Sequence, residues 1–421
     1  MIDFNLSTFK NGLRLATAPI VTSEAVTILI LVSVGGRYEK DSERGISHFL
    51  EHLFFKGTKK RPTALKIAHE LDSLGAQYNA FTGEEYTGLY IKSAAEDFDK
   101  SFEILSDMFL NSAFPEEELQ REKGVILEEA NMRRDVPQSY VQILSQRQMF
   151  SNDPLGEDLV GRPETIKKIT RRDILAYRQI GYSPESTTIV ICGKKTTAWE
   201  KRVEAVFGGL PAHPKPVFKS TDNFIVSPKI SQDVRKIDQA HFILSCQAFK
   251  KTDPRRYALA ILSTILGGGM SSRLFSQIRE KRGWAYYVGA SLGAYHDTGY
   301  IDFVAGVKRD KLADSVKIIL EQIEDLKKNG PTKAELEKTK SNLRGHLALS
   351  LEDSFEIANF LSEELLYEED KIRQPEKILS AIEKVTREDV KRLSQELFLS
   401  DKMGLSVVGP EDYEAQLKNL F

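Results

Sequence analysis

Cysteine and histidine are both scarce in this sequence of 421 residues, which contains two Cys and seven His. Cys192 and Cys246 each lie in an apolar run with the character of a strand. We therefore expect buried free thiols rather than a disulfide or a metal-binding cysteine pair. A disulfide-stabilised fold is not predicted, and a reducing cytoplasm fits this cysteine content best.

Long apolar runs and an excess of one charge are also missing. The longest apolar run, residues 25–34, is too short to span a bilayer and predicts a buried strand. The first ten residues lack the basic start, apolar centre and cleavage site of a secretory signal. The 59 Lys and Arg against 61 Asp and Glu provide no basic surface for nucleic acid or an anionic membrane. We expect a cytoplasmic protein with neither kind of partner.

The sequence is long enough for two domains, and its 41% hydrophobic content can bury substantial cores. Three Pro and two Gly fall within residues 208–216, a composition that sustains neither a helix nor a central strand. This composition predicts a linker at residues 213–227, between an N-terminal domain at 1–212 and a C-terminal domain at 228–421.

The two halves show a similar order of predicted elements. Each begins with two strands, continues with two helices and two more strands, and ends with several helices and a final strand (first strands 13–18, 25–34, 230–236 and 240–249; final strands 187–192 and 404–408). Residues 310–328 and 333–349 carry apolar residues at helical spacing. The duplicated order predicts an α+β fold of two similar domains, each a mostly antiparallel sheet with helices packed on one face.

Two of the histidines stand four positions apart in the segment His48-Phe49-Leu50-Glu51-His52. In a helix, His48 and His52 project from one face, one turn apart, with Glu51 beside them. Neutral imidazole is a good ligand for Zn²⁺, and a catalytic zinc keeps three protein ligands and one position for water. Glu51 can take the proton of that water. The order is the inverzincin signature, and the plainer alternative is a helix whose histidines cap a surface turn or fill a core gap.

A third ligand has to come from another segment, and residues 115–129 are the candidate. They begin with Pro and acids, as helix N-termini do. Glu122 and Glu129 are seven positions apart and share a face, whereas Glu128 is turned about 100° away. We expect Glu129 to be the ligand and Glu122 its neighbour. Periodicity alone does not choose among the three, and a solvated acidic helix face is the alternative.

The spacing of these motifs resembles that of the pitrilysin-type inverzincin family of zinc metallopeptidases. In that family the His-x-x-Glu-His motif is followed about 75 residues later by two Glu separated by six residues. Here Glu129 follows His52 by 77 positions. Residues 45–58 also resemble the bacterial processing-peptidase branch, which is similar to the beta subunit of mitochondrial processing peptidase. The resemblance implies that His48, His52 and Glu129 bind one Zn²⁺ and that Glu122 supports the site.

A second motif, residues 267–288, resembles a segment of the C-terminal half in the same family. That segment supplies an Arg and a Tyr, seven positions apart, to the active site, and Arg279 and Tyr286 carry this spacing here. Tyr287 is off register by one. A guanidinium and a phenol can stabilise the negative charge that develops on a carbonyl oxygen during hydrolysis. Without the resemblance, the two residues would be interpreted as surface and packing residues.

Residues 75–91 are predicted to form two short strands around a turn at Gly83. In relatives, the strand equivalent to Asn79, Ala80, Phe81 and Thr82 is a sheet edge to which the substrate peptide adds as a strand. Strand addition uses backbone hydrogen bonds, so it selects extended, unfolded chains of varied sequence. An ordinary hairpin with Phe81 in the core is the alternative.

The sequence therefore predicts a zinc metalloendopeptidase that hydrolyses extended peptides. The resemblance implies that the two domains face each other as a clamshell and that Arg279 and Tyr286 complete the site on closure. Because one chain carries both sets of motifs, we expect a homodimer, or else a self-sufficient monomer, rather than an obligate heterodimer. Peptides are the other expected partners. The alternative function is a non-catalytic subunit or partner protein that retains the zinc site.

Overall fold

The computed structural model describes residues 2–221, 226, 229–368 and 372–420, which form two compact units. Unit 1 contains residues 1–130, 158–219 and 347–375, and unit 2 contains residues 131–157, 220–346 and 376–421. Each predicted domain is one continuous stretch of sequence. In the structure, unit 1 includes residues 347–375 from the C-terminal half, and unit 2 includes residues 131–157 from the N-terminal half.

The predicted linker, 213–227, contains no helix or strand in the part that the structure describes, residues 213–221 and 226. Residues 222–225 and 227 lie outside the described residues. No helix in the described part of the chain is long and apolar enough to cross a membrane.

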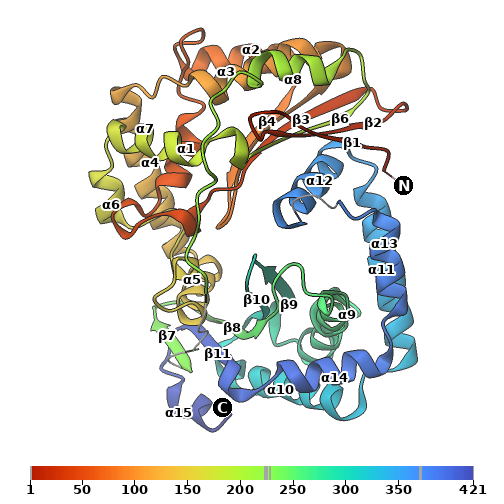
Figure 1. The fold of residues 1–421 in the computed structure, drawn as a ribbon. Coiled ribbons are helices and arrows are strands. Elements are labelled where there is room, and N and C mark those ends of the chain that lie inside the picture. The colour runs from red at the N-terminus through yellow and green to blue at the C-terminus, as the bar shows by residue number, and fades with distance from the viewer. Residues whose placement is uncertain (1, 222–225, 227–228, 369–371, 421) are drawn as a thin grey trace. The chain divides into compact units, whose positions relative to one another are not determined.

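Unit 1 is built on a six-stranded sheet in the order β1-β2-β6-β3-β5-β4 (Figure 1). β2 and β6 are parallel, and the other neighbouring strands are antiparallel. The strands are β1 Asn5–Thr8, β2 Arg14–Pro19, β3 Ala25–Val32, β4 Gln77–Thr82, β5 Thr87–Ala94 and β6 Thr187–Gly193. Its helices are α1 Ile46–Leu53, α2 Ala64–Ser73, α3 Phe98–Asn111, α4 Glu116–Asp135, α6 Pro163–Lys168, α7 Arg171–Gly181, α8 Trp199–Phe207 and α12 Ser354–Glu368.

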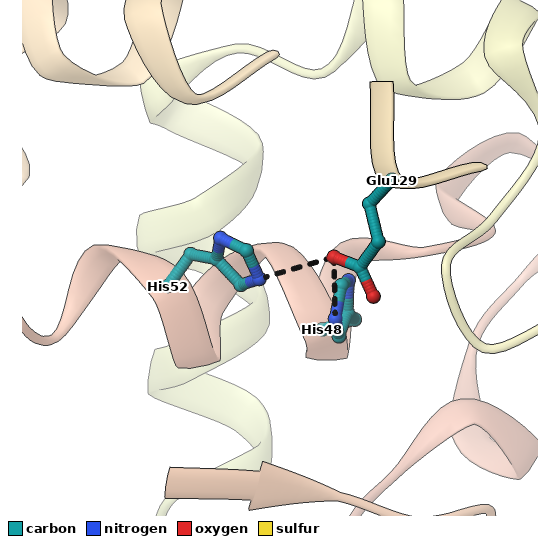
Figure 2. Close-up of side chains that lie close together, drawn as sticks. All are labelled: His48, His52 and Glu129. Atoms are coloured by element: carbon teal, nitrogen blue, oxygen red, sulfur yellow. Dashed lines mark ion pairs between the residues drawn. The ribbon is translucent and has the colours of Figure 1, made fainter. Parts of the chain in front are cut away.

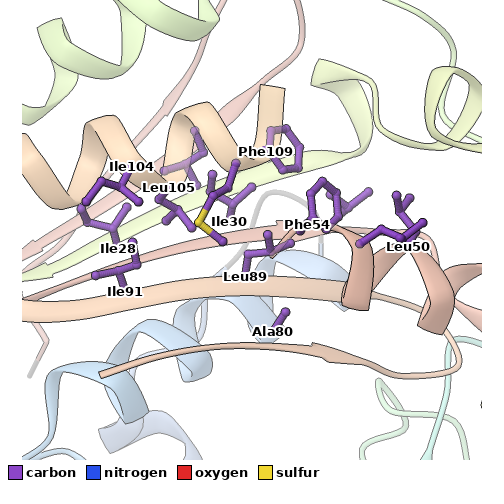
Figure 3. Packing of buried hydrophobic residues seen from close by; sticks show 14 of the residues in the cluster. Ile28, Ile30, Leu50, Phe54, Ala80, Leu89, Ile91, Ile104, Leu105 and Phe109 are labelled. Atoms are coloured by element: carbon purple, nitrogen blue, oxygen red, sulfur yellow. The ribbon is translucent and has the colours of Figure 1, made fainter. Parts of the chain in front are cut away.

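The main core of unit 1 lies between this sheet and α3, with α1 at its end (Figure 3). Side chains alternate between the two faces of a strand, so Ile28 and Ile30 of β3 point toward α3 and meet Ile104 and Leu105. Leu29, between them, belongs to a second cluster on the other face, with Leu361 and its neighbours on α12. β3 is therefore buried on both sides, as its continuous apolar run predicts.

Unit 2 is built on a five-stranded sheet in the order β7-β11-β8-β10-β9. Its strands are β7 Ile230–Val234, β8 Gln239–Ala248, β9 Ala285–Ala294, β10 Gly299–Lys308 and β11 Met403–Gly409. Its helices are α5 Pro137–Met149, α9 Arg256–Gly267, the π-helix η6 Phe275–Glu280, α10 Leu312–Asn329, α11 Lys333–Ser350, α13 Pro375–Lys384, α14 Arg387–Leu397 and α15 Glu414–Leu417, of which α11 ends in unit 1.

The two sheets share one topology, which confirms the predicted duplication. The order β2-β6-β3-β5-β4 in unit 1 corresponds strand for strand to β7-β11-β8-β10-β9 in unit 2. Both sheets also have their single parallel pair in the same place, β2 with β6 and β7 with β11. The fold is α+β, as predicted.

One feature of the helix layers was not predicted from the sequence. The main helical layer covers one face of each sheet, but the opposite face carries one further helix, α12 in unit 1 and α5 in unit 2. Each of these helices comes from the other half of the sequence. They account for the two exchanged segments, 131–157 and 347–375.

Candidate metal centre

The helix α1 presents an apolar face to the core and a polar face to the candidate site. Ile46, Phe49, Leu50 and Leu53 recur at helical spacing and are fully buried. The polar face contains His48, Glu51 and His52, which are all partly buried. Burial of the apolar face therefore fixes the direction in which both imidazoles point.

A carboxylate from outside the helix caps the N-terminus of α1. The residue at the N-cap position, Gly45, has φ 92° and no side chain, so it cannot cap the helix itself. Glu39 instead accepts hydrogen bonds from the backbone N–H groups of Gly45 and Ser47, both at 2.8 Å. Burial raises the pKa of Glu39 to about 7, against the opposing effect of these hydrogen bonds. Glu39 thus fixes the end of α1 nearest His48.

His48, His52 and Glu129 converge from two helices, α1 and α4 (Figure 2). Oε2 of Glu129 lies 3.6 Å from Nε2 of His48 and 3.7 Å from Nε2 of His52. The two imidazole rings lie 4.6 Å apart between centroids, at an angle of 63°. One oxygen and two nitrogens therefore point at a common position.

This donor set fits a divalent transition metal. One ligand atom from each residue can be chosen so that all three lie within 4.8 Å of one another. A tetrahedral zinc site with bonds of about 2.0–2.2 Å separates its ligand atoms by about 3.3–3.6 Å. The two distances to Glu129 are close to that range. Two imidazoles and one carboxylate are also a common ligand set for catalytic zinc. The group could hold a metal ion with small side-chain movements.

Glu122 contacts the opposite edge of the His52 ring. Its Oε2 lies 3.1 Å from Nδ1 of His52, and its Oε1 lies 2.7 Å from Nζ of Lys56. Burial raises the pKa of Glu122, but these contacts lower it by more, so that the net pKa is lowered. An ionised Glu122 holds the proton of His52 on Nδ1 and leaves Nε2 free to bind a metal.

Glu51 stands next to the group without belonging to it. Burial raises the pKa of the Glu51 carboxyl, as does the charge of Glu129, while the neighbouring Thr82 and His52 lower it by less. A carboxylate with a raised pKa is a stronger base. Glu51 is thus a base beside the three converging ligand atoms.

The strand β4, which contains Asn79, Ala80, Phe81 and Thr82, is an edge of the sheet in the described part of unit 1. Gly83, just after β4, donates its backbone N–H to the carbonyl of Tyr86, just before β5. In an antiparallel pair, every second residue counted back from Gly83 therefore hydrogen-bonds to β5. Ala80 falls between such pairs, and its N–H bonds the side chain of Asn79 at 2.9 Å. The outer edge of β4 can accept a further strand, while Phe81 is only partly buried.

Arg279 and Tyr286 lie in unit 2. Arg279 is in η6, where its guanidinium lies 5.0 Å from the ring centre of Phe275, and Tyr286 is on β9 with 60% of its surface exposed. Tyr287, one position on, hydrogen-bonds Nδ1 of His241 at 2.9 Å. Tyr286 is therefore exposed, whereas the hydroxyl of Tyr287 is already hydrogen-bonded within unit 2. Their approach to the metal centre stays a prediction.

Sequence reasoning missed two residues of the site, Glu39 and Lys56. Lys56 stands four positions after His52, which is a spacing that places side chains near each other at a helix end. That signal was available. Glu39 lies outside any helix, and its role depends on a chain reversal that no local pattern indicates.

Comparisons with known proteins agree with this geometry. Residues 14–162 match the model of the Insulinase family, peptidase family M16, and residues 168–343 match the Peptidase M16 inactive domain. An uncharacterized zinc protease of Bacillus subtilis, YmxG, is 34% identical over 96% of this chain and 97% of its own length. The chain belongs to peptidase family M16. Another M16 relative, an uncharacterized zinc protease of Streptomyces coelicolor, is 33% identical over 96% of this chain and 89% of its own.

Solved structures share the M16 fold. A protease from Helicobacter pylori superposes with a TM-score of 0.89 at 23% identity, covering 97% of this chain and 100% of that chain. A Pseudomonas fluorescens protein described as a peptidase M16 inactive domain gives 0.90 at 18% identity, with 98% and 99% covered. At these identities the likeness shows the fold alone. Similarity to the beta subunit of mitochondrial processing peptidase in particular stays a prediction.

Proposed function

We propose that this chain is a zinc-dependent metalloendopeptidase that hydrolyses extended peptides. The observation that carries the proposal is the convergence of His48, His52 and Glu129 on one position, with Glu51 beside it. Their distances fit zinc, and full-length relatives carry the name zinc protease. Structural zinc usually has four protein ligands, whereas three with an adjacent base are typical of catalysis.

The alternative is a non-catalytic M16 subunit that keeps the metal site. The term inactive domain in the family comparison applies to residues 168–343. His48, Glu51, His52 and Glu129 all lie outside that range and within residues 14–162, which match the Insulinase model. Their presence as a complete set favours the enzyme.

The chain's own residues divide the chemistry between them. Zinc, when bound by His48, His52 and Glu129, supplies positive charge that polarises the scissile carbonyl and makes a nearby water more acidic. Glu51 removes a proton from the attacking water and then delivers it to the nitrogen of the leaving amine. Glu122 keeps His52 in the tautomer that binds the metal through Nε2.

The edge of β4 is the proposed binding site for the peptide backbone. An added strand would pair with the outward groups of Ala80 and its alternate neighbours, and so bring an extended peptide past Thr82 and Glu51. We propose that Arg279 and Tyr286 stabilise the developing oxyanion when the two domains close around the peptide. The homodimer and the cytoplasmic location stay predictions of the sequence.

The test compares three carboxamide variants for bound zinc and for cleavage of unstructured peptides by mass spectrometry. Glu51→Gln should keep zinc while its rate falls by about 10²- to 10⁴-fold, the usual contribution of a general base. Glu129→Gln should lose both zinc and activity. Glu128→Gln is the matched control, since Glu128 is exposed on the same helix, and it should retain both.

Full activity in Glu51→Gln, or in chelated wild-type protein, would contradict the proposal. A wild-type protein that binds zinc at the predicted residues but cleaves no peptide would favour the non-catalytic alternative.

A further inference from the structure

A second polar cavity lies in unit 2, on the face of the sheet that α5 covers. It has a volume of about 180 Å³ and is lined by residues of α5, β8, β9 and β10. One water molecule needs roughly 10–15 Å³ of such space, so the cavity can hold a much larger group. The described residues that line it all belong to unit 2.

Asp302 of β10 lines this cavity. The strand register places Asp302 opposite Ser245 on β8 and opposite Ser291 on β9, so the three side chains share one face of the sheet. The carboxyl is held in place because the Ser245 hydroxyl donates to its Oδ1 at 2.6 Å. Ser145 of α5 lies 2.6 Å from the Ser245 oxygen and completes the chain.

The hydrogen bonds around Asp302 leave its Oδ2 oxygen free to accept, while the hydroxyl protons of Ser145 and Ser245 are already used. Ser245 gives its proton to Asp302, so it must accept the proton of Ser145. No donor among the described residues bonds to Oδ2 of Asp302, and Asp302 is a partly buried residue that lines the cavity. A ligand that fits this arrangement has to bring hydrogen-bond donors of its own.

In the described part of the chain, no positively charged residue lines the cavity beside Asp302. Among the described residues that line it, Asp302 is the only acid and none is Lys, Arg or His. Withdrawal from water therefore raises the pKa of Asp302 to about 7, an effect that the Ser245 hydrogen bond only reduces. A carboxyl held in such a place costs stability unless a ligand compensates for it.

We propose that this cavity binds the side chain of an arginine or lysine residue in a bound peptide. The cationic head would donate hydrogen bonds to Asp302, with the amides of Gln142 and Gln146 nearby. The aliphatic stem would lie against Met149, Ile243 and Val304, which supply the apolar part of the wall. This inference rests on the proposed function in that the ligand is a peptide.

The test uses pairs of peptides in which one arginine is moved stepwise along a neutral sequence and replaced in the partner by citrulline. Citrulline keeps the shape of arginine but removes its charge. With wild-type protein at pH 8, at least one register should favour arginine by about tenfold or more in kcat/KM, as expected for a charge-assisted hydrogen bond. Asp302→Asn should reduce this ratio to near one.

Asp314→Asn is the matched control, because Asp314 is an exposed acid of the same unit outside the cavity. It should keep the wild-type ratio. Equal cleavage of both peptides by wild type in every register, or an arginine preference that survives Asp302→Asn, would overturn the inference.

A binding measurement separates this inference from the proposed function. Fluorescence anisotropy with the Glu51→Gln protein should show the same preference for arginine and its loss when Asp302→Asn is added. If that preference is present but no peptide is ever cleaved, the proposed function fails and the cavity assignment stands. If cleavage occurs without any charge preference in either measurement, the cavity assignment fails alone.

Discussion

Glu128 and Glu129 are neighbours on α4, yet only the Glu129 carboxylate reaches the two histidine rings. Helical geometry turns adjacent side chains about 100° apart, so Glu128 is exposed. Glu122, seven positions before Glu129 and on the same face of the helix, is buried against His52. The candidate ligand set therefore depends on the rotational position of α4 to within one residue.

Asp302 should make the stability of the protein depend on pH. Its pKa is about 7 in the folded protein against 3.8 for the free group, so the folded state holds the proton more tightly. The associated stabilisation is complete below about pH 4 and is lost as the pH rises through 7. Between pH 5.5 and 7, wild type should lose stability relative to Asp302→Asn by up to about 1.4 kcal/mol per pH unit.

Urea unfolding midpoints of the two proteins, measured side by side at several pH values without peptide, check this expectation. The comparison cancels the titration of all other groups, including Glu39. A difference that does not change with pH would show that Asp302 is as well solvated in the folded protein as in the unfolded chain.

The strand β4 should impose a two-residue period on substrate binding. Ala80 directs its N–H away from β5, so only alternate backbone groups of β4 face the open edge. An added peptide strand must alternate in the same way. Methylation of single backbone nitrogens along a substrate should therefore raise KM at alternate positions by about two- to thirteenfold, the value of one hydrogen bond, and have little effect between them.

The measurement is KM for each singly methylated peptide, with the matching unmethylated peptide as the control. Effects of equal size at every position would contradict strand addition and would indicate recognition by side-chain pockets alone.

Most elements could be predicted from the sequence because they depend on local patterns. The predicted strand 25–34 is β3 at Ala25–Val32, and the predicted helices 310–328 and 333–349 are α10 at Leu312–Asn329 and α11 at Lys333–Ser350. The free, buried thiols of Cys192 and Cys246 were also predicted correctly. Apolar periodicity and strand composition suffice for such features.

The rest depends on contacts between distant segments. Nothing local in the sequence of α5 or α12 indicates that each packs on the sheet of the other sequence half. The third metal ligand could be limited to three acids, and the choice of Glu129 came from a family pattern rather than from periodicity. The cavity around Asp302 was not predicted, because its residues come from four elements.

At the scale of the whole molecule, the proposed mechanism requires residues of both units. Arg279 lies in unit 2, whereas the candidate metal centre lies in unit 1. Arg279→Ala should therefore leave zinc binding unchanged and lower kcat by about 10²- to 10³-fold, the usual effect of removing a donor to an oxyanion. Steady-state kinetics together with the zinc content of the purified variant check this expectation.

Arg282→Ala is the control for the Arg279 experiment. Arg282 is exposed three positions further on, where its guanidinium lies 5.4 Å from the ring centre of Trp284. Its loss should leave kcat within about twofold of wild type. Equal losses in the two variants would indicate a general effect on unit 2 instead of a direct role for Arg279.

Anomalous diffraction at the zinc absorption edge from crystals of the zinc-loaded protein tests the central claim most directly. The account predicts one peak per chain, about 2.0–2.2 Å from Nε2 of His48, Nε2 of His52 and a carboxylate oxygen of Glu129. A chain without such a peak, or with its zinc bound at other residues, would contradict it.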